Sequence, residues 1–90
     1  MERISRRVVI TGRVQGVMFR ASCAQEAKRE KIVGYAKNLP DGSVEVLLEG
    51  DADAVEKVLS WCHQGPPSAR VDTVNIHNVP TSNYTDFSVL

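Results

Sequence analysis

Residues 32–50 read IVGYAKNLPDGSVEVLLEG and contain the clearest strand pattern of the chain. In Ser43–Gly50, Val and Leu residues largely alternate with Glu residues, as in a strand with one buried face. Ile32–Leu39 is a second extended segment. Pro40–Gly42 between them predicts a turn, because proline fixes φ and glycine accepts positive φ. Together these segments predict a β-hairpin in the middle of the chain.

A helical pattern lies on each side of this hairpin. Before it, Phe19–Lys31 contains no Gly or Pro and places apolar residues at helical spacing. After it, Asp51 is suited to cap a second helix. That helix should end before Gly65–Pro67, because glycine favours the position after a helix and proline cannot continue one. The predicted buried stripes are Phe19, Cys23, Ala24 and Ala27 in the first helix, and Val55, Val58, Leu59 and Cys62 in the second.

Extended segments flank both helices. Arg6–Arg13 and Val71–Val79 have strand-like patterns, and Tyr84–Leu90 closes the chain as a short strand after a break at Pro80–Asn83. Two helices cannot cover both faces of such a sheet. We therefore expect an α+β fold, a ferredoxin-like α/β sandwich with an antiparallel sheet in βαββαβ order plus a short C-terminal strand, and both helices on one face. This length supports one core, so residues 1–90 are expected to form a single domain.

The charge of the chain narrows the function classes. The formal net charge is zero, which argues against general nucleic-acid binding. Residues 1–37 carry nine Lys or Arg against three acids, and residues 38–90 carry two against eight. Either the surface is simply mixed after folding, or one end attracts a small anion. A ferredoxin-like RNA-binding domain would need an exposed aromatic cluster on central strands, and Tyr35, Tyr84 and Phe87 do not form an RNP-like motif.

The cysteines and histidines carry no recognisable metal pattern. Cys23 and Cys62 have no Cys-x-x-Cys spacing, and His63 and His77 lack partner ligands at a metal-binding distance in sequence. No apolar run reaches transmembrane length, and Met1–Arg7 lacks the apolar stretch of a signal peptide. We therefore expect a cytoplasmic protein without a metal, a membrane partner or a nucleic-acid partner.

Both cysteines are predicted to be buried core thiols. The nearness of Cys23 to Arg20 could lower the pKa of its thiol. Because the two helices should be neighbours, a disulfide between Cys23 and Cys62 is an alternative, disfavoured by the reducing cytoplasm.

The loop Val14–Arg20 (VQGVMFR) carries the clearest chemical signal. Gly16 allows the chain to curl, so that the free N–H groups at the start of the helix can form an anion-binding nest. Arg20 adds a planar charged fork matched to phosphate oxygens. In the expected fold, Asn38 at the end of the second strand lies at the same sheet edge as this loop. Ligands bind at such an edge in parallel sheets, and we extend this to the present sheet by analogy. The loop lacks the Walker A pattern, and taken alone it is more often a plain connection.

Three motifs together are more specific. Gly12–Arg20, Gly34–Asn38 and Asp41–Glu45, at their observed spacing, resemble the two signatures of the acylphosphatase family. The resemblance extends over essentially the whole chain. It departs from the family at Glu30-Lys31, where Leu-Gly is frequent, at Tyr35, where Trp is common, and at Cys23, where Thr is frequent. These departures affect packing and the surroundings of the site.

The resemblance implies metal-independent, cofactor-free hydrolysis of the carboxyl–phosphate bond of acyl phosphates. The expected catalytic residues are Arg20, which would bind the phosphate, and Asn38, which would orient the attacking water. A neutral amide cannot act as a general base, but it can hold a water molecule. The residues expected to bind phosphate, mainly through main-chain N–H groups, are Gln15, Gly16, Val17, Met18, Phe19 and Arg20.

The expected substrate is a small-molecule acyl phosphate, with inorganic phosphate or sulfate as a competing anion, and the expected state is a monomer. The alternative is a non-catalytic ferredoxin-like module that uses the same loop to hold phosphate or an acyl phosphate. Retention of both Arg20 and Asn38 favours catalysis.

Overall fold

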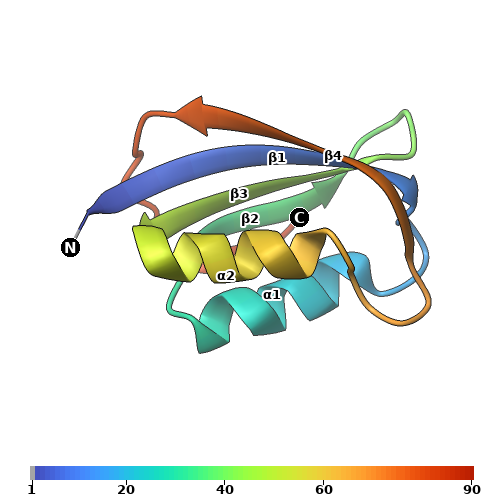
Figure 1. Ribbon diagram of the computed structural model, residues 1–90, viewed down its shortest axis with the longest axis horizontal. Coiled ribbons are helices and arrows are strands. Elements are labelled where there is room, and N and C mark those ends of the chain that lie inside the picture. The colour runs from blue at the N-terminus through green and yellow to red at the C-terminus, as the bar shows by residue number, and fades with distance from the viewer. Residues whose placement is uncertain (1) are drawn as a thin grey trace.

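The computed structural model describes residues 2–90 and contains a single sheet with two helices (Figure 1). The elements in chain order are β1 (Arg3–Arg13), α1 (Phe19–Arg29), β2 (Val33–Asn38), β3 (Val44–Asp51), α2 (Ala52–Cys62), β4 (Arg70–Val79) and β5 (Phe87–Val89). The βαββαβ order and the ferredoxin-like sandwich are therefore confirmed. Neither of these helices is long and apolar enough to cross a membrane.

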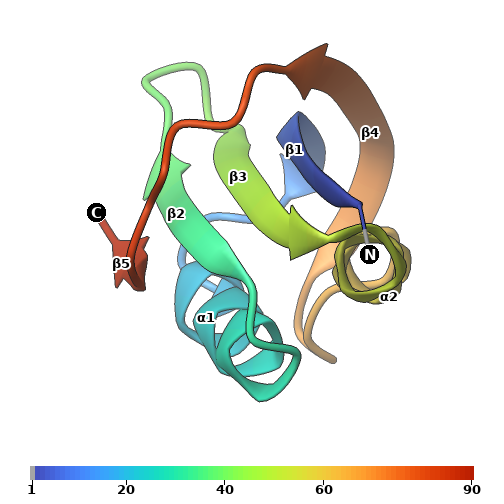
Figure 2. The same cartoon turned by 90° about the vertical axis from the view of Figure 1, so that its left-hand side faces the viewer.

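The strands lie in the order β4-β1-β3-β2-β5, and both helices cover the same face of the sheet (Figure 2). β1 pairs antiparallel with β3 and β4, and β2 pairs antiparallel with β3, as predicted. β5 differs, because it runs parallel to β2. The chain crosses from β4 at one edge to the opposite edge before β5 begins, so the final strand enters in the direction of β2. The sheet is therefore mixed rather than wholly antiparallel.

The core lies between the sheet and the helices. The alternation in β3 places Val44, Val46 and Leu48 in this core, each fully buried. Both predicted helix stripes are confirmed, since every residue named in them is buried. Trp61 is partly buried at the edge of the core, and its ring lies 5.2 Å from that of Phe19, centroid to centroid.

The element ends differ from the sequence expectations. β1 begins at Arg3 instead of Arg6, because its pairing with β3 continues as far as Arg3 opposite Asp51. Asp51 does lie at the N-cap of α2, but its side chain makes no capping hydrogen bond. The final strand shrinks to Phe87–Val89, because only that segment pairs with β2.

The end of α1 has a specific cause. Lys31 has φ of 60°, the left-handed conformation that usually falls to glycine after a helix. The N–H of Ile32 donates to the carbonyl of Ala27 at 2.8 Å, and that of Lys31 donates to Lys28 at 3.1 Å. These bonds close the helix at Arg29, so the predicted extension to Lys31 is wrong.

Residues 80–86, here called the crossover segment, pass over the sheet face that the helices leave open. The N–H of Ser82 donates to Oε1 of Glu49 at 2.8 Å, and Arg3 donates to Oε2 at 2.9 Å. Burial would raise the pKa of Glu49, but these donors outweigh it and hold that pKa below its usual value. The ring of Tyr84 lies 6.1 Å from that of Tyr35. This buried carboxylate thus anchors the segment that leads to β5.

Cys23 and Cys62 are free, fully buried thiols on the facing helices. The pKa of Cys23 is raised well above its usual value by a hydrogen bond with the Cys62 thiol and by burial. The suggestion that Arg20 lowers this pKa is therefore wrong, because the thiol points into the core. The alternative of a disulfide is wrong as well.

Candidate active site

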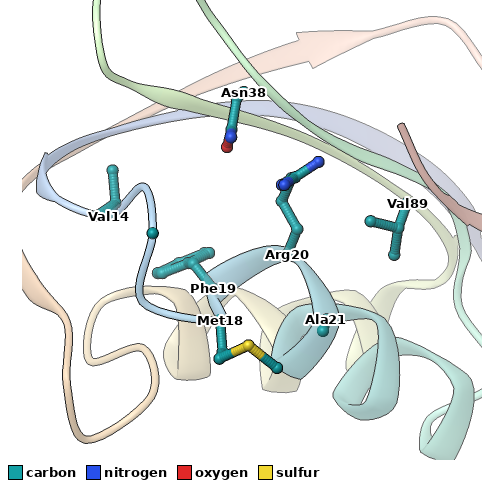
Figure 3. Close-up of a pocket in the computed structure, with 8 residues that line it drawn as sticks. Val14, Met18, Phe19, Arg20, Ala21, Asn38 and Val89 are labelled. Atoms are coloured by element: carbon teal, nitrogen blue, oxygen red, sulfur yellow. The ribbon is translucent and has the colours of Figure 1, made fainter.

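A pocket of about 260 Å³ lies where β1 ends and α1 begins (Figure 3). Its walls come from the loop after β1, the first turn of α1, the end of β2 and the short strand β5. The lining residues are Val14, Gly16, Met18, Phe19, Arg20, Ala21, Asn38 and Val89. Segments far apart in the sequence thus meet at one edge of the sheet.

The loop that enters the pocket is curled. Gly16 has φ of 73° and Met18 has φ of 66°, so two residues close together adopt the left-handed conformation. This conformation costs a non-glycine residue such as Met18 about 1 kcal/mol. Among residues 2–90, no acceptor pairs with the main-chain N–H groups of Gln15 to Met18. A strained loop with free donors has the features of an anion-binding nest.

Arg20 lies in the first turn of α1, and its guanidinium reaches into the space between Asn38 and Val89 (Figure 3). Nη1 donates to the main-chain oxygen of Leu90 at 2.5 Å. Leu90 is itself held by its N–H, which donates to the carbonyl of Ala36 in β2 at 2.9 Å. This contact orients the guanidinium through one nitrogen and leaves its other donors available for an anion.

Asn38 is the last residue of β2 and is exposed, with its amide directed toward the loop (Figure 3). It has the same parity along the strand as buried Ala36, so it points to the side of the sheet that carries α1. The pairing of β3 with both β1 and β2 places the carboxyl ends of these two strands together. The structure therefore brings Arg20 and Asn38 into one pocket.

The donor set of the pocket suits an anion. Among residues 2–90, no group of three or more His, Cys, Asp or Glu side chains could hold a metal ion. The polar groups present are main-chain N–H groups, a guanidinium and a carboxamide, which together can bind phosphate oxygens and a water molecule.

The family model described as Acylphosphatase matches residues 6–89, nearly the whole chain. The chain belongs to the acylphosphatase family. A relative named acylphosphatase from Methylococcus capsulatus is 46% identical over 84 residues, which are 92% of this chain and 91% of that protein. A relative of the same name from Roseiflexus sp. is 43% identical and is covered over 98% of its length. The homologues are thus hydrolases by name.

A solved acylphosphatase structure from Coxiella burnetii has the same fold. It superposes with a TM-score of 0.94 at 35% identity, over 98% of this chain and 93% of that one. The overall architecture of the acylphosphatase family is therefore present throughout this chain.

Of the acylphosphatase signature residues predicted to bind phosphate, Gly16, Met18, Phe19 and Arg20 line the pocket, whereas Gln15 and Val17 do not. Val17 is buried, and its carbonyl accepts a hydrogen bond from Ser68 at 3.1 Å. The side chain of Gln15 donates to the turn between β2 and β3. Only their main-chain N–H groups therefore remain as candidates for contact with an anion.

Sequence patterns missed Ala21 and Val89, which complete the lining of the pocket. Val89 belongs to a three-residue strand whose parallel pairing with β2 is not encoded in any local motif. Tyr35, the departure from the usual Trp, lies outside the pocket and donates its hydroxyl to Glu45 at 2.6 Å. That substitution consequently affects the open face of the sheet rather than the site.

Proposed function

We propose that this protein hydrolyses acyl phosphates to a carboxylate and inorganic phosphate. The observation that carries the proposal is the meeting of the curled loop, Arg20 and Asn38 in one pocket of about 260 Å³. Membership of the acylphosphatase family supports the same activity.

In the proposed reaction, the main-chain N–H groups of residues 15–20 and the Arg20 guanidinium bind the phosphoryl group. Phosphoryl transfer requires mainly alignment and stabilisation of charge, and fixed donors supply both without reorganising. Because the guanidinium is already held by Leu90, little rotational freedom is lost when the substrate binds.

Asn38 would orient the attacking water in line with the scissile bond. The carboxamide both donates and accepts hydrogen bonds, so it can fix a water molecule, but it cannot take its proton. As the bond from the water oxygen to phosphorus forms, the bond from phosphorus to the acyl oxygen breaks, and the electron pair leaves with the carboxylate. The water proton passes to a phosphate oxygen or to solvent.

An assay with acetyl phosphate or an aryl acyl phosphate tests this function. We expect hydrolysis that a chelator does not inhibit and that inorganic phosphate or sulfate inhibits competitively. Arg20→Ala and Asn38→Ala should each reduce turnover by about 10²-fold or more, as the loss of comparable charge-stabilising or orienting groups does. Matched controls are Arg13→Ala and Asn75→Ala, both exposed and outside the pocket.

The same assay distinguishes the non-catalytic alternative. A module that only holds phosphate would bind the anion through Arg20, as calorimetry can measure, without turnover in the wild-type protein. Equal activity of the wild type, Arg20→Ala and Asn38→Ala would contradict the proposed site.

We also propose that the protein acts in the cytoplasm as a monomer on a small-molecule substrate. The buried free thiols are compatible with a reducing compartment. Light scattering after size-exclusion chromatography tests the monomer, and fractionation of the source cells tests the compartment.

A further inference from the structure

We propose that Gln15 is a positioning residue: its carboxamide locks the phosphate loop to the turn that follows Asn38. This lock would set the distance between the bound phosphoryl group and the amide that orients the water. The inference rests on the proposed function and assigns the side chain of Gln15 a role separate from that of its main-chain N–H.

The contacts of Gln15 are directional. Its Nε2 donates to the carbonyl of Leu39 at 2.8 Å and to the carbonyl of Ser43 at 2.9 Å. A primary amide has two N–H donors, so both are used on two main-chain acceptors of one turn. The side chain is half-buried, which limits competition from water for these hydrogen bonds.

The turn that receives Gln15 is closed by hydrogen bonds of its own. Its main chain is closed by the N–H of Leu39, which donates to Ser43 at 2.8 Å, and by the N–H of Gly42, which donates to Leu39 at 3.1 Å. Asp41 accepts hydrogen bonds from both the N–H and the hydroxyl of Ser43, at 2.9 and 2.5 Å. The hydrogen bonds of Gln15 therefore fix the position of Leu39, the residue directly after Asn38, relative to the loop.

The topology explains why such a lock is needed. β1, which carries the loop, and β2, which carries Asn38, are separated by β3 and share no main-chain pairing. Among residues 2–90, the two bonds of Gln15 are the side-chain hydrogen bonds that join residues 14–18 to residues 38–43. On its other side the loop is held by Ser68, which donates to Val17.

Position matters here because Asn38 is exposed at the end of its strand. In the part of the chain that the structure describes, its main chain is fixed by the turn and by the pairing of β2 with β3. A displacement of about 1 Å between reacting groups can lower a rate about 10²-fold, even when binding is retained. Gln15 is therefore expected to affect turnover more than affinity.

The test is Gln15→Met, which keeps the length of the side chain and removes both donors. With benzoyl phosphate, we expect kcat to fall about tenfold or more. KM and the inhibition constant of inorganic phosphate should change less than about threefold, because Arg20 and the loop N–H groups remain. The matched control is Gln25→Met on the exposed face of α1, which should leave all three values unchanged.

A double-mutant cycle separates positioning from a general structural effect. If Gln15 acts through Asn38, adding Gln15→Met to Asn38→Ala should change kcat by less than about twofold. An inhibition constant that rises in step with the loss of kcat would overturn the proposal, since the loop itself would then have been damaged. So would a full, additive effect in the double variant. If Gln15→Met does not fold, Gln15→Asn applies the same test with a shorter amide that cannot reach both carbonyls.

The side-chain amide resonances of Asn38 provide a readout that does not depend on activity. Line broadening of these resonances in Gln15→Met, but not in Gln25→Met, is expected, and unchanged resonances would contradict the lock. An inactive wild type or a fully active Asn38→Ala would contradict the proposed function. A wild-type kcat in Gln15→Met, with Asn38→Ala impaired, would contradict only the role of Gln15.

Discussion

The polar groups that lie beside the two ends of β1 differ in whether they have partners within the protein. At its start, the carboxylate of Glu49 is fully buried and receives donors from Arg3 and Ser82. At its end, the N–H groups of Gln15 to Met18 have no acceptor within residues 2–90 and lie beside the pocket. One end satisfies its charge internally, and the other leaves donors for an outside anion. The difference suits the start of β1 to stability and its end to the proposed binding of an anion.

The largest expected effect comes from removing the guanidinium of Arg20 at the pocket end of β1. Arg20→Ala should lower kcat/KM by about 10²–10³-fold, because the developing charge on the phosphoryl group loses its guanidinium. Steady-state kinetics measures this, and thermal unfolding should show only a modest shift, since the side chain is not part of the core. Arg20→Lys should recover only part of the activity, because lysine lacks the planar fork. Full recovery would contradict a bidentate contact.

The second largest effect is expected from removing the charge of Glu49 near the start of β1. Glu49→Gln should lower the free energy of unfolding by about 2 kcal/mol, because a buried site loses its charge-assisted hydrogen bonds. Chemical denaturation measures the change. The kcat of the folded protein should stay within about twofold, because Glu49 in β3 pairs with Ser5 near the start of β1 and does not line the pocket at its other end. Glu56→Gln on exposed α2 is the control and should be neutral. A loss of kcat with unchanged stability would contradict the division between the two ends.

The pH dependence of stability sharpens the same comparison. The pKa of Glu49 is lower in the folded protein than in the unfolded chain. Its stabilising contribution is therefore present above the unfolded value, about 4.3, and is lost as the pH falls through the folded value. Denaturation midpoints measured from pH 7 down to pH 3 should fall less steeply in Glu49→Gln than in the wild type. Parallel curves would show that the carboxylate is not linked to folding.

The smallest expected effect is a gain at the end of α1. Lys31→Gly should raise the free energy of unfolding by up to about 1 kcal/mol, because glycine adopts the left-handed conformation without strain. Lys28→Gly, inside the exposed face of the same helix, should instead destabilise by about 1 kcal/mol. Thermal unfolding of both variants distinguishes the strain at Lys31 from a general dependence on lysine. Activity should be unchanged in each.

Local patterns predicted the elements that carry periodic apolar residues. The alternation in β3 and the apolar stripes of both helices were sufficient to predict the order of the elements and the packing of both helices on one face of the sheet. The pairing of β5 was not predictable in this way, because three residues hold no period and its partner β2 lies far away in sequence. The predicted end of α1 was too late, because Lys31 has the left-handed conformation that usually belongs to a glycine, and no glycine marks the end of the helix in the sequence.

The residues of the site that belong to sequence motifs were predictable. The contacts that depend only on how the strands are arranged in space were not. Arg20 and Asn38 are recognisable from their signatures, and the sheet order brings them together. The contacts of Gln15 with Leu39 and Ser43 could not be foreseen, since they join residues across an intervening strand. The acceptor of Arg20 at Leu90 depends on the return of the chain to β2, which no composition or spacing indicates.

The attachment of Arg20 to Leu90 couples the pocket to a short strand at the edge of the sheet. β5 spans only three residues at a sheet edge, so it is suited to detach while the remaining strands stay paired. Such partial opening would let the guanidinium swing free although the core persists. On gradual heating, hydrolysis should therefore decline several degrees before the circular dichroism of the helices is lost.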